Sequence, residues 1–427
     1  DTNISDDKGL GAIYNTDIAT LVLNATSLTG NNSRLGGAIY NLGSLSADYK
    51  TKFTSNTAQK GGAIYNKSDK NIKIEGSSFS KNTAEYGGAI YNAGNSNLQI
   101  KLYDYTYVSK GKEKHKYYNP VVSSNTAISG AGVYNNGEIV SEKVTFSKNN
   151  ANNNSSNLTS DELDKVGNGG AIYNNGKLTV SNSTFSSNNA TTNIVDVVED
   201  VLTSSTKYTT TTSIGGNGGA IYNISSDNLS ISNSTFTSNK SGMNGGAIAN
   251  DNENSDLNIS GSTFKSNSSL NKIVTKEYSV NNKTNKKSST KTVSSVYNDR
   301  GKGGAIYSKG TININDDLAF TYDVKNQKVT QFTSNSSYNG GAIYAENGLN
   351  VTSTTFVSNS AKGNGGAVYI VDGSECNIAN SNFTKNNAVN GGAIYVGKNS
   401  NVTIQDTSFI NNTASGQGGA IYADRNS

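Results

Sequence analysis

The sequence predicts an all-β protein, a single parallel β-helix of about thirteen coils. A hexapeptide of the type Gly-Gly-Ala-Ile-Tyr-Asn, complete for the first time at residues 36–41, returns along the whole chain. Phenylalanine recurs at one fixed place after it, and no stretch shows the 3.6-residue periodicity of a helix. A repeat of about 26 residues is typical of stacked supersecondary units, each of which buries its apolar face on its neighbours.

The isoleucine of the hexapeptide marks each copy. Its thirteen positions are Ile13, Ile39, Ile64, Ile90, Val133, Ile172, Ile221, Ile248, Ile306, Ile343, Val368, Ile394 and Ile421. We expect one elongated domain over residues 1–427, because a solenoid has no closed core that limits its length. A right-handed winding is expected.

Each unit contains three short segments with strand character. The hexapeptide comes first, followed by an alternating segment such as residues 98–100 or 402–404, and then by a Phe-x-x-Asn segment. Alternation with a period of two indicates strands with one buried face. Because each segment must pair in parallel with its own copy one turn later, the rod should be roughly 60 Å long at the usual strand spacing.

Two columns of side chains are expected inside this rod. Ten of the eleven phenylalanines fill one slot, which predicts a stack of rings from coil to coil. They are Phe53, Phe79, Phe146, Phe185, Phe236, Phe264, Phe332, Phe356, Phe383 and Phe409. Three residues after the slot an asparagine always follows, which predicts a ladder of side-chain amides. These asparagines are Asn31, Asn56, Asn82, Asn125, Asn149, Asn188, Asn239, Asn267, Asn335, Asn359, Asn386 and Asn412.

The hexapeptide itself sets the geometry of the coil. Its glycines would supply positive φ angles and a close approach of neighbouring backbones. Neighbouring residues of a strand point to opposite faces, so we place the isoleucine inward and the tyrosine outward. Twelve tyrosines would then form an external ribbon, which either binds sugars or other surfaces or only stiffens the rod.

Composition excludes several classes of protein. A net charge of +4 on 427 residues gives no reason to expect nucleic acid as a partner. The single Cys376 cannot form an internal disulfide and is expected to be a buried structural thiol, whereas a His or Cys metal site would need more ligands. No apolar run is long enough to span a bilayer, so any membrane attachment is expected through segments outside this chain.

Long intervals between copies indicate loop insertions, and all of them fall between coils four and ten. Long loops on a rigid scaffold are where recognition usually takes place. The insertions span about residues 101–121, 150–168, 189–217, 268–302 and 315–331. The second, third and fourth of these lie along one edge of the rod, where they could form a small subdomain.

Charge and aromatic content single out two of these insertions. Residues 268–302 are strongly basic and follow two acidic insertions, so the loops either pack on one another or bind an acidic glycan or protein surface. The candidate binding lysines there are Lys283, Lys286, Lys287 and Lys291. Residues 101–121 combine tyrosine with lysine, a composition that suits a binding surface. The candidate binding residues of this insertion are Tyr103, Tyr105 and Tyr107. The alternative is an amphipathic hairpin folded on the rod.

Catalysis finds little support in the sequence, and we expect no catalytic residue and no cofactor. Polysaccharide-cleaving β-helices need clustered acids, or a Lys or Arg, at a cleft, whereas the strand positions here carry Ser, Thr and Asn. The compact acid groups are Asp316 with Asp317, and Asp196 with Glu199 and Asp200. A nucleophile would need a histidine base, and His115 is the only histidine.

The pairing of Gly-Gly-Ala-Ile-Tyr with Phe-x-x-Asn resembles the repeat of the chlamydial polymorphic outer-membrane proteins and of adhesin-like surface proteins. The resemblance covers all thirteen coils. It implies a surface-exposed β-helix that mediates adhesion, with a host-cell or neighbouring-cell protein or glycan as the partner and an extracellular location. Two alternatives stay open: a fibre subunit that self-associates through open β-helix ends, and a polysaccharide-degrading enzyme.

Overall fold

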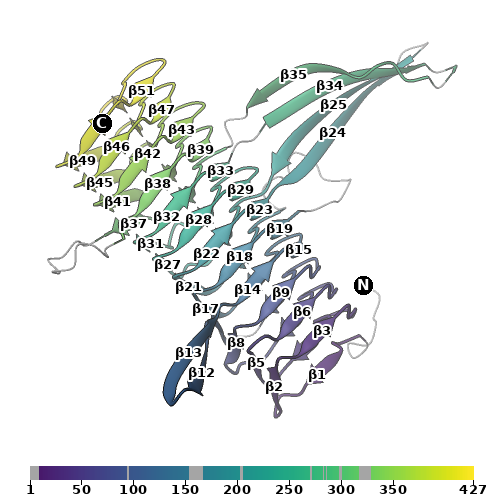
Figure 1. The fold of residues 1–427 in the computed structure, drawn as a ribbon. Coiled ribbons are helices and arrows are strands. Elements are labelled where there is room, and N and C mark those ends of the chain that lie inside the picture. Colours follow the sequence, from purple (N-terminus) through teal and green to yellow (C-terminus); the bar gives the residue numbers. More distant parts are fainter. Residues whose placement is uncertain are drawn as a thin grey trace.

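The chain winds into a rod whose sides are four parallel sheets, each built from one strand of successive coils, as the computed structural model shows (Figure 1). The structure describes residues 9–93, 96–152, 167–201, 205–269, 272–281, 283–284, 286–297, 301–316 and 328–427. The predicted parallel β-helix is confirmed, and its right-handed winding stays a prediction. Among the residues described, no helix is long and apolar enough to cross a bilayer.

The hexapeptides form the first sheet, which we call the IYN sheet. Each strand pairs in register with its own copy, for example Ile39 with Ile64 and Tyr40 with Tyr65. Its strands are β1 (Ile13–Asn15), β4 (Ile39–Asn41), β7 (Ile64–Asn66), β10 (Ile90–Asn92), β16 (Val133–Asn135), β20 (Ile172–Asn174), β26 (Ile221–Asn223), β30 (Ile248–Asn250), β36 (Ile306–Ser308), β40 (Ile343–Ala345), β44 (Val368–Ile370), β48 (Ile394–Val396) and β52 (Ile421–Ala423). We number the coils by these strands.

The alternating segments form the middle sheet, in which every second side chain is buried, as in β5 and β11. Its strands are β2 (Thr20–Asn24), β5 (Ser44–Asp48), β8 (Ile72–Glu75), β11 (Asn97–Lys101), β17 (Glu138–Glu142), β21 (Lys177–Ser181), β27 (Leu229–Ser232), β31 (Leu257–Ser260), β37 (Ile312–Asn315), β41 (Gly348–Thr352), β45 (Glu375–Ala379) and β49 (Asn401–Gln405).

The third sheet, the Phe sheet, carries a phenylalanine ring at the centre of ten of its twelve three-residue strands, and Leu28 or Val122 in the other two. Its strands are β3 (Ser27–Thr29), β6 (Lys52–Thr54), β9 (Ser78–Ser80), β14 (Val121–Ser123), β18 (Thr145–Ser147), β22 (Thr184–Ser186), β28 (Thr235–Thr237), β32 (Thr263–Lys265), β38 (Gln331–Thr333), β42 (Thr355–Val357), β46 (Asn382–Thr384) and β50 (Ser408–Ile410). Neighbouring rings lie nearly parallel, with centroids 4.7 Å apart for Phe185 and Phe236 and 4.5 Å apart for Phe356 and Phe383.

A fourth, short sheet was not expected from the sequence. Its two-residue strands follow the Phe-sheet strands of coils four to twelve and hold a small buried residue, such as Ala190 or Ser269. They are β15 (Thr126–Ala127), β19 (Asn150–Ala151), β23 (Asn189–Ala190), β29 (Lys240–Ser241), β33 (Ser268–Ser269), β39 (Ser336–Ser337), β43 (Ser360–Ala361), β47 (Asn387–Ala388) and β51 (Thr413–Ala414). The short sheet turns the chain back toward the IYN sheet.

The two glycines of the hexapeptide have different structural roles. The first adopts a positive φ in every copy, for example +62° at Gly218, and a Cβ there would lie 2.1 Å from the Ile221 carbonyl oxygen. The second lets the backbones approach, since a Cβ on Gly219 would lie 2.1 Å from the Gly246 carbonyl oxygen. Coil one keeps the first glycine as Gly11, at φ +58°, and lacks the second.

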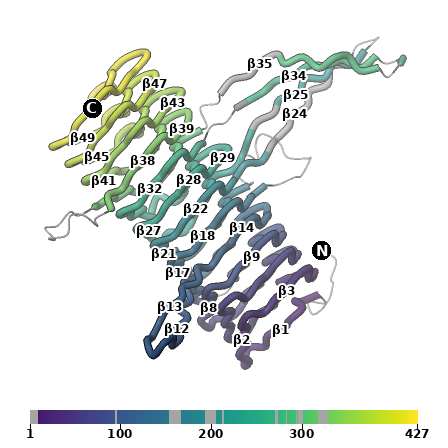
Figure 2. The backbone as a smooth tube through the Cα atoms, in the orientation of Figure 1, coloured from purple at the N-terminus to yellow at the C-terminus, as the bar shows by residue number. Residues whose placement is uncertain are grey.

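Two antiparallel elements project from the rod on different sides (Figure 2). A hairpin of β12 (Tyr103–Ser109) and β13 (Lys112–Tyr118) leaves coil four. A four-stranded sheet, in the order β24 (Thr192–Val201), β25 (Ser205–Gly215), β34 (Lys272–Asn281) and β35 (Lys291–Tyr297), joins the insertions of coils six and eight.

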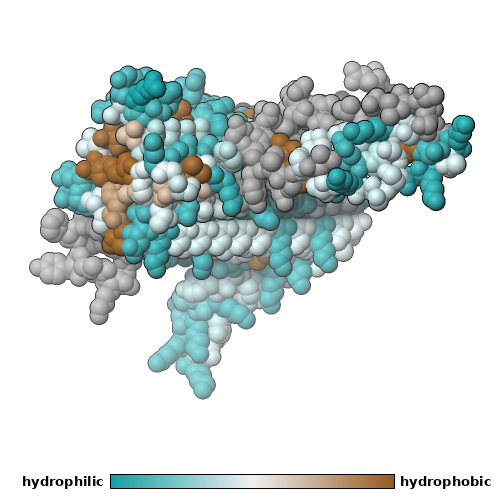
Figure 3. Space-filling view, turned by 90° about the horizontal axis from the view of Figure 1, so that it is seen from above, coloured by the Kyte–Doolittle hydropathy of each residue, from teal (hydrophilic) through white to brown (hydrophobic). Residues whose placement is uncertain are grey.

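The surface between these elements is mainly hydrophilic (Figure 3). Apolar side chains gather at the end of the rod that carries the last coils, where Ile410 is 51% exposed and Val402, Ile404, Phe409 and Ile421 are only partly buried. Elsewhere most apolar residues point inward, although Ile18 and Val22 of the first coil and Val108 of the hairpin are exposed.

Candidate interaction surfaces

The hairpin of β12 and β13 presents one face rich in tyrosine and lysine. The register sets Tyr103 opposite Tyr118, Tyr105 opposite Lys116 and Tyr107 opposite Lys114, and directly paired residues share a face. We call these six residues the Tyr/Lys face. The expected hairpin is therefore present, but it projects from the rod instead of folding on it (Figure 1). Tyr105 and Tyr107 are consequently 41% and 38% exposed.

Tyr49, on the rod, anchors the base of the Tyr/Lys face. Its ring stacks on Tyr105 at 5.4 Å between centroids, and its hydroxyl lies 3.3 Å from that of Tyr118. The hydrogen bond with Tyr118, followed by that with Lys50, lowers the pKa of the Tyr49 phenol. A continuous line of rings thus runs from the rod onto the hairpin, and Tyr107 extends it with a centroid 5.9 Å from that of Tyr105.

The opposite face of the hairpin carries His115 with acidic neighbours. Its Nδ1 atom lies 2.9 Å from the Asp104 carboxylate and 3.3 Å from the Thr106 hydroxyl. A catalytic relay needs the hydroxyl and the carboxylate on different ring nitrogens, so that one proton can be taken up while the other is held. Asp104 and Thr106 share Nδ1, whereas the Glu113 carboxylate lies 3.9 Å from Nε2, too far for a hydrogen bond. Because all of these side chains are also exposed, this cluster is a surface hydrogen-bond network.

The four-stranded sheet brings together two of the insertions. Strand β25 of coil six pairs with β34 of coil eight over Ser205–Thr212, with Tyr208 opposite Tyr278. Their rings stack at 4.9 Å between centroids, and the Lys207 ammonium lies 3.0 Å from the Glu277 carboxylate. These contacts favour packing of the loops on one another, which was one of the two alternatives for the basic insertion.

The basic tip of this sheet holds the four predicted binding lysines. Lys283, Lys286, Lys287 and Lys291 are all exposed. The Lys287 ammonium lies 3.7 Å from the centroid of the Tyr278 ring, a cation–π contact that holds it against the sheet. The acidic residues predicted in the insertion at 150–168 lie outside the described residues, as do positions 317–327 of the last insertion.

The tyrosine column lies on the outer face of the IYN sheet, separate from the core formed by the isoleucines and phenylalanines. Its rings stack from coil to coil, with centroids 4.4 Å apart for Tyr134 and Tyr173. Half of the twelve rings are nevertheless buried, with Tyr307 only 3% and Tyr395 only 9% exposed, whereas Tyr14 is 49% exposed. Burial raises the pKa of both phenols, and their hydroxyls donate to Glu346 and Asp424. This arrangement favours stiffening of the rod over binding.

Of the compact acid groups, only Asp316 has a described side chain. Asp316 is buried and accepts hydrogen bonds from the backbone nitrogens of Gly261 and Thr330, so it closes the base of the last insertion. Its neighbour Asp317 lies outside the described residues, and the side chains of the acidic residues on β24 are likewise not described. Within the described ranges, no three His, Cys, Asp or Glu side chains converge as a metal site would require.

A second asparagine column inside the rod was missed by the sequence analysis. In coils one to eight the last residue of the hexapeptide is an asparagine that points inward, and its amide donates to the next copy, as from Asn41 to Asn66 at 2.8 Å. It also holds the following turn, through a bond from Asn41 to the Gly43 carbonyl at 2.9 Å. The signal was present, because residues two apart in a strand share a face and the isoleucine two positions earlier was already placed inward.

Seven segments of the chain match the model of the Chlamydia polymorphic membrane protein repeat. They are residues 50–67, 76–93, 143–175, 233–251, 329–346, 353–371 and 406–424. The match at 233–251 is typical: it starts in the turn before β28 and ends just after β30, so it holds a Phe strand and the next IYN strand. No curated protein and no solved structure gives a significant match.

Proposed function

We propose that this chain, whose coils carry the Chlamydia polymorphic membrane protein repeat, is the β-helical part of a non-enzymatic adhesin at the cell surface. The observation that carries the proposal is the Tyr/Lys face on a hairpin that projects from the rod. The repeat is that of a family of surface proteins, and a surface position would expose the hairpin to a neighbouring cell.

The chemistry of the Tyr/Lys face supports adhesion. Tyrosine gives large contact area at low conformational cost, and its hydroxyl adapts to different polar partners. Lys114 and Lys116 add positive charge beside Tyr105 and Tyr107. A host or neighbouring-cell protein or glycan with acidic groups is therefore the proposed partner. The rod would act as the stalk that carries this face, because its stacked coils make it long and stiff.

Attachment of protein-coated beads to a panel of cultured cells tests the proposal. Beads that carry the intact chain should attach more than uncoated beads. The double variant Tyr105→Ser/Tyr107→Ser should lower attachment by about fivefold or more, since a few exposed aromatic residues usually carry most of the binding energy. Tyr103 and Tyr118 keep their ring contacts with Tyr49, so the base of the hairpin should stay anchored and the variant should fold normally.

Tyr117→Ser is the matched control, because Tyr117 is 60% exposed on the other face of the same hairpin. It should leave attachment nearly unchanged. Attachment no greater than that of uncoated beads would reject the adhesin. If attachment survived loss of the hairpin tyrosines but disappeared when Lys283, Lys286, Lys287 and Lys291 were changed to alanine, recognition would belong to the four-stranded sheet.

A further inference from the structure

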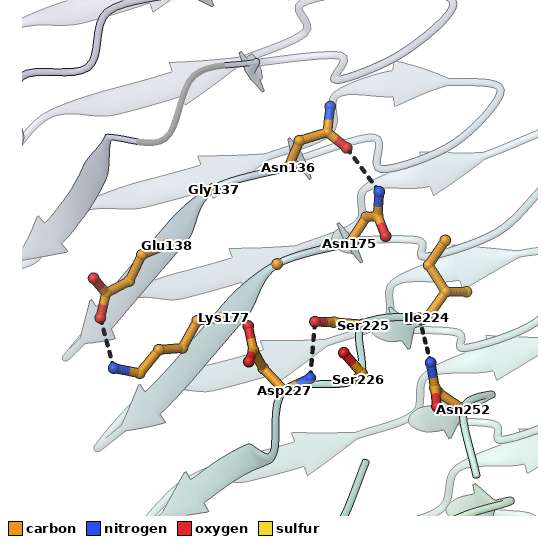
Figure 4. A pocket seen from close by; sticks show the side chains of 11 residues that line it. Asn136, Gly137, Glu138, Asn175, Lys177, Ile224, Ser225, Ser226, Asp227 and Asn252 are labelled. Atoms are coloured by element: carbon orange, nitrogen blue, oxygen red, sulfur yellow. Dashed lines mark hydrogen bonds and ion pairs between the residues drawn. The ribbon is translucent and has the colours of Figure 1, made fainter. Parts of the chain in front are cut away.

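A polar groove of about 580 Å³ crosses coils five to eight at the corner between the IYN sheet and the middle sheet (Figure 4). This corner carries none of the insertions among the described residues. The groove is lined by Asn136 and Glu138 of coil five, Asn175 and Lys177 of coil six, and Ser226 and Asp227 of coil seven. Its size is that of an ordinary small-molecule site.

Differences in turn length create the groove. In coils five and six, only two residues, Asn136–Gly137 and Asn175–Gly176, join the IYN strand to the middle strand. In coils seven and eight the same connection takes residues 224–228 and 251–256. Two short turns therefore lie beside two long ones, and the long turns form a wall above a floor made of the short ones.

The polar side chains of the floor are held in place by their neighbours. Glu138 accepts a hydrogen bond from Asn97 at 3.1 Å and pairs with the Lys177 ammonium at 3.1 Å. The Asn175 amide donates to Asn136 at 3.3 Å, and Asn136 in turn donates to the Tyr91 hydroxyl at 3.3 Å. The groove thus offers prearranged amide and carboxylate groups next to the tyrosine column.

Asp227 stands on the wall above this floor. Its backbone nitrogen donates to the Ser225 hydroxyl at 3.1 Å, which fixes the turn, and its carboxylate is exposed. Coil three has the same five-residue turn, in which the Lys70 backbone nitrogen donates to the Ser68 hydroxyl at 3.0 Å. There the long Lys70 side chain crosses the short turn of coil two and donates to the Asp17 carbonyl. An aspartate in place of this lysine leaves the groove of coils five to eight open.

We propose that this groove binds a neutral oligosaccharide. Small-molecule sites are usually lined by apolar side chains, whereas this one presents amides, hydroxyls and carboxylates, which match the hydroxyl groups of a sugar. Lys177 is already paired with Glu138, so the Asp227 carboxylate gives the groove a net negative charge that disfavours sulfated or other acidic glycans. Vicinal sugar hydroxyls can donate to the Asp227 and Glu138 oxygens and accept from the asparagine amides.

This inference deepens the proposed adhesion, on which it rests for its setting at a surface, by naming a ligand class and a second contact point. The two can fail separately. Binding of a sugar in the groove is measured in solution and does not use the hairpin, whereas bead attachment is measured with hairpin variants.

The test is calorimetric titration of the purified chain with neutral tetrasaccharides of glucose, galactose, mannose and N-acetylglucosamine, and with a sulfated tetrasaccharide. At least one neutral probe should bind with a Kd of roughly 0.1–1 mM. Asp227→Lys should weaken that binding about tenfold or more, because the new side chain can cross the short turns as Lys70 does. The lysine already occurs at this position of the turn in coil three, so the variant should fold.

Asp69→Lys is the control, since it makes the same charge change at an exposed site in the corresponding turn of coil three. It should leave the Kd unchanged. Asn175→Ala, which removes an exposed amide of the floor, should weaken binding by about threefold or more. The proposal is overturned if no neutral probe binds, if the sulfated probe binds best, or if Asp227→Lys and Asp69→Lys have the same effect.

Discussion

The side-chain nitrogen of Asn188 lies 3.0 Å from the side-chain oxygen of Asn239 in the next coil. The same nitrogen donates to the Phe146 carbonyl at 3.0 Å, and the Asn188 oxygen accepts from both the backbone and the side chain of Asn149. Asn188 is fully buried, so every polar atom of its amide is used inside the protein. The column therefore joins three coils at each step.

Asn188→Ala should destabilise the central coils by about 3–5 kcal/mol, because it leaves donors of Asn149 and the Phe146 carbonyl buried without partners. Urea unfolding, with hydrogen exchange of the amides in coils five to seven, measures the loss. Asn350→Ala is the control: Asn350 also sits in an inter-coil amide ladder but is exposed, and its loss should cost less than about 0.5 kcal/mol. Equal losses in the two variants would show that burial of the ladder is unimportant.

The first glycine of the hexapeptide should tolerate no side chain. Gly218→Ala places a Cβ about 2.1 Å from the Ile221 carbonyl oxygen at a φ of +62°, so steric overlap adds to backbone strain. We expect a loss of about 3 kcal/mol or more, measured by urea unfolding. Gly373→Ala has a similar φ of +78° but meets no atom within 4 Å, and should lose only about 1 kcal/mol. Similar losses would mean that strain alone keeps the first position as glycine.

Repetition made much of the rod predictable from the sequence. A residue that returns at one place in every unit must stack on its copies, which is how Phe185 and Asn188 were placed in columns. The short sheet was missed because strands such as Asn189–Ala190 have two residues and no β-branched or aromatic side chain. A strand of that length leaves no periodicity to detect.

Packing of the insertions on one another was one of the two alternatives that the sequence left open, but the individual contacts lay beyond sequence reasoning. Tyr208 and Tyr278 meet although a complete coil separates their insertions, and the sequence does not specify this register. The direction in which the hairpin carries Tyr105 away from the rod was likewise not predictable. The alternation of residues along a strand predicts which side chains share a face, but it does not predict how the hairpin is oriented on the rod. The groove at Asp227 depends on differences between neighbouring turns, each of which is ordinary by itself.

Alkaline pH should destabilise the rod through its buried tyrosines. Burial, with the nearby Glu346 carboxylate, raises the pKa of Tyr307, so the folded protein keeps a proton that the unfolded chain releases above about pH 10. Stability should therefore be complete below about pH 10 and fall above it, by up to about 1.4 kcal/mol per pH unit for each such tyrosine.

The measurement is the urea midpoint between about pH 8 and 12. Tyr307→Phe should make the decline above about pH 10 shallower, at the cost of the hydrogen bond to Glu346 at all pH values. Tyr117→Phe, at a 60% exposed position, should leave the decline as it is. A decline that is the same in Tyr307→Phe and in the unaltered chain would remove Tyr307 as a cause.

Cys376 should be unreactive until the rod unfolds. It replaces an apolar residue of the middle sheet, where its register partners are Leu349 and Val402, and it is only 1% exposed. Burial raises the pKa of its thiol to about 12, so at neutral pH the reactive thiolate is nearly absent, and the core also excludes the reagent. Alkylation at about pH 8 should therefore be at least about a hundredfold slower in the native chain than in urea, as followed by mass spectrometry.

Cys376→Val should change the free energy of unfolding by less than about 1.5 kcal/mol, because valine already fills this slot in the next coil. Cys376→Ser should lower it by about 1–3 kcal/mol, because it buries a hydroxyl. Rapid alkylation of the native chain, or a serine variant as stable as the valine one, would contradict a buried structural thiol.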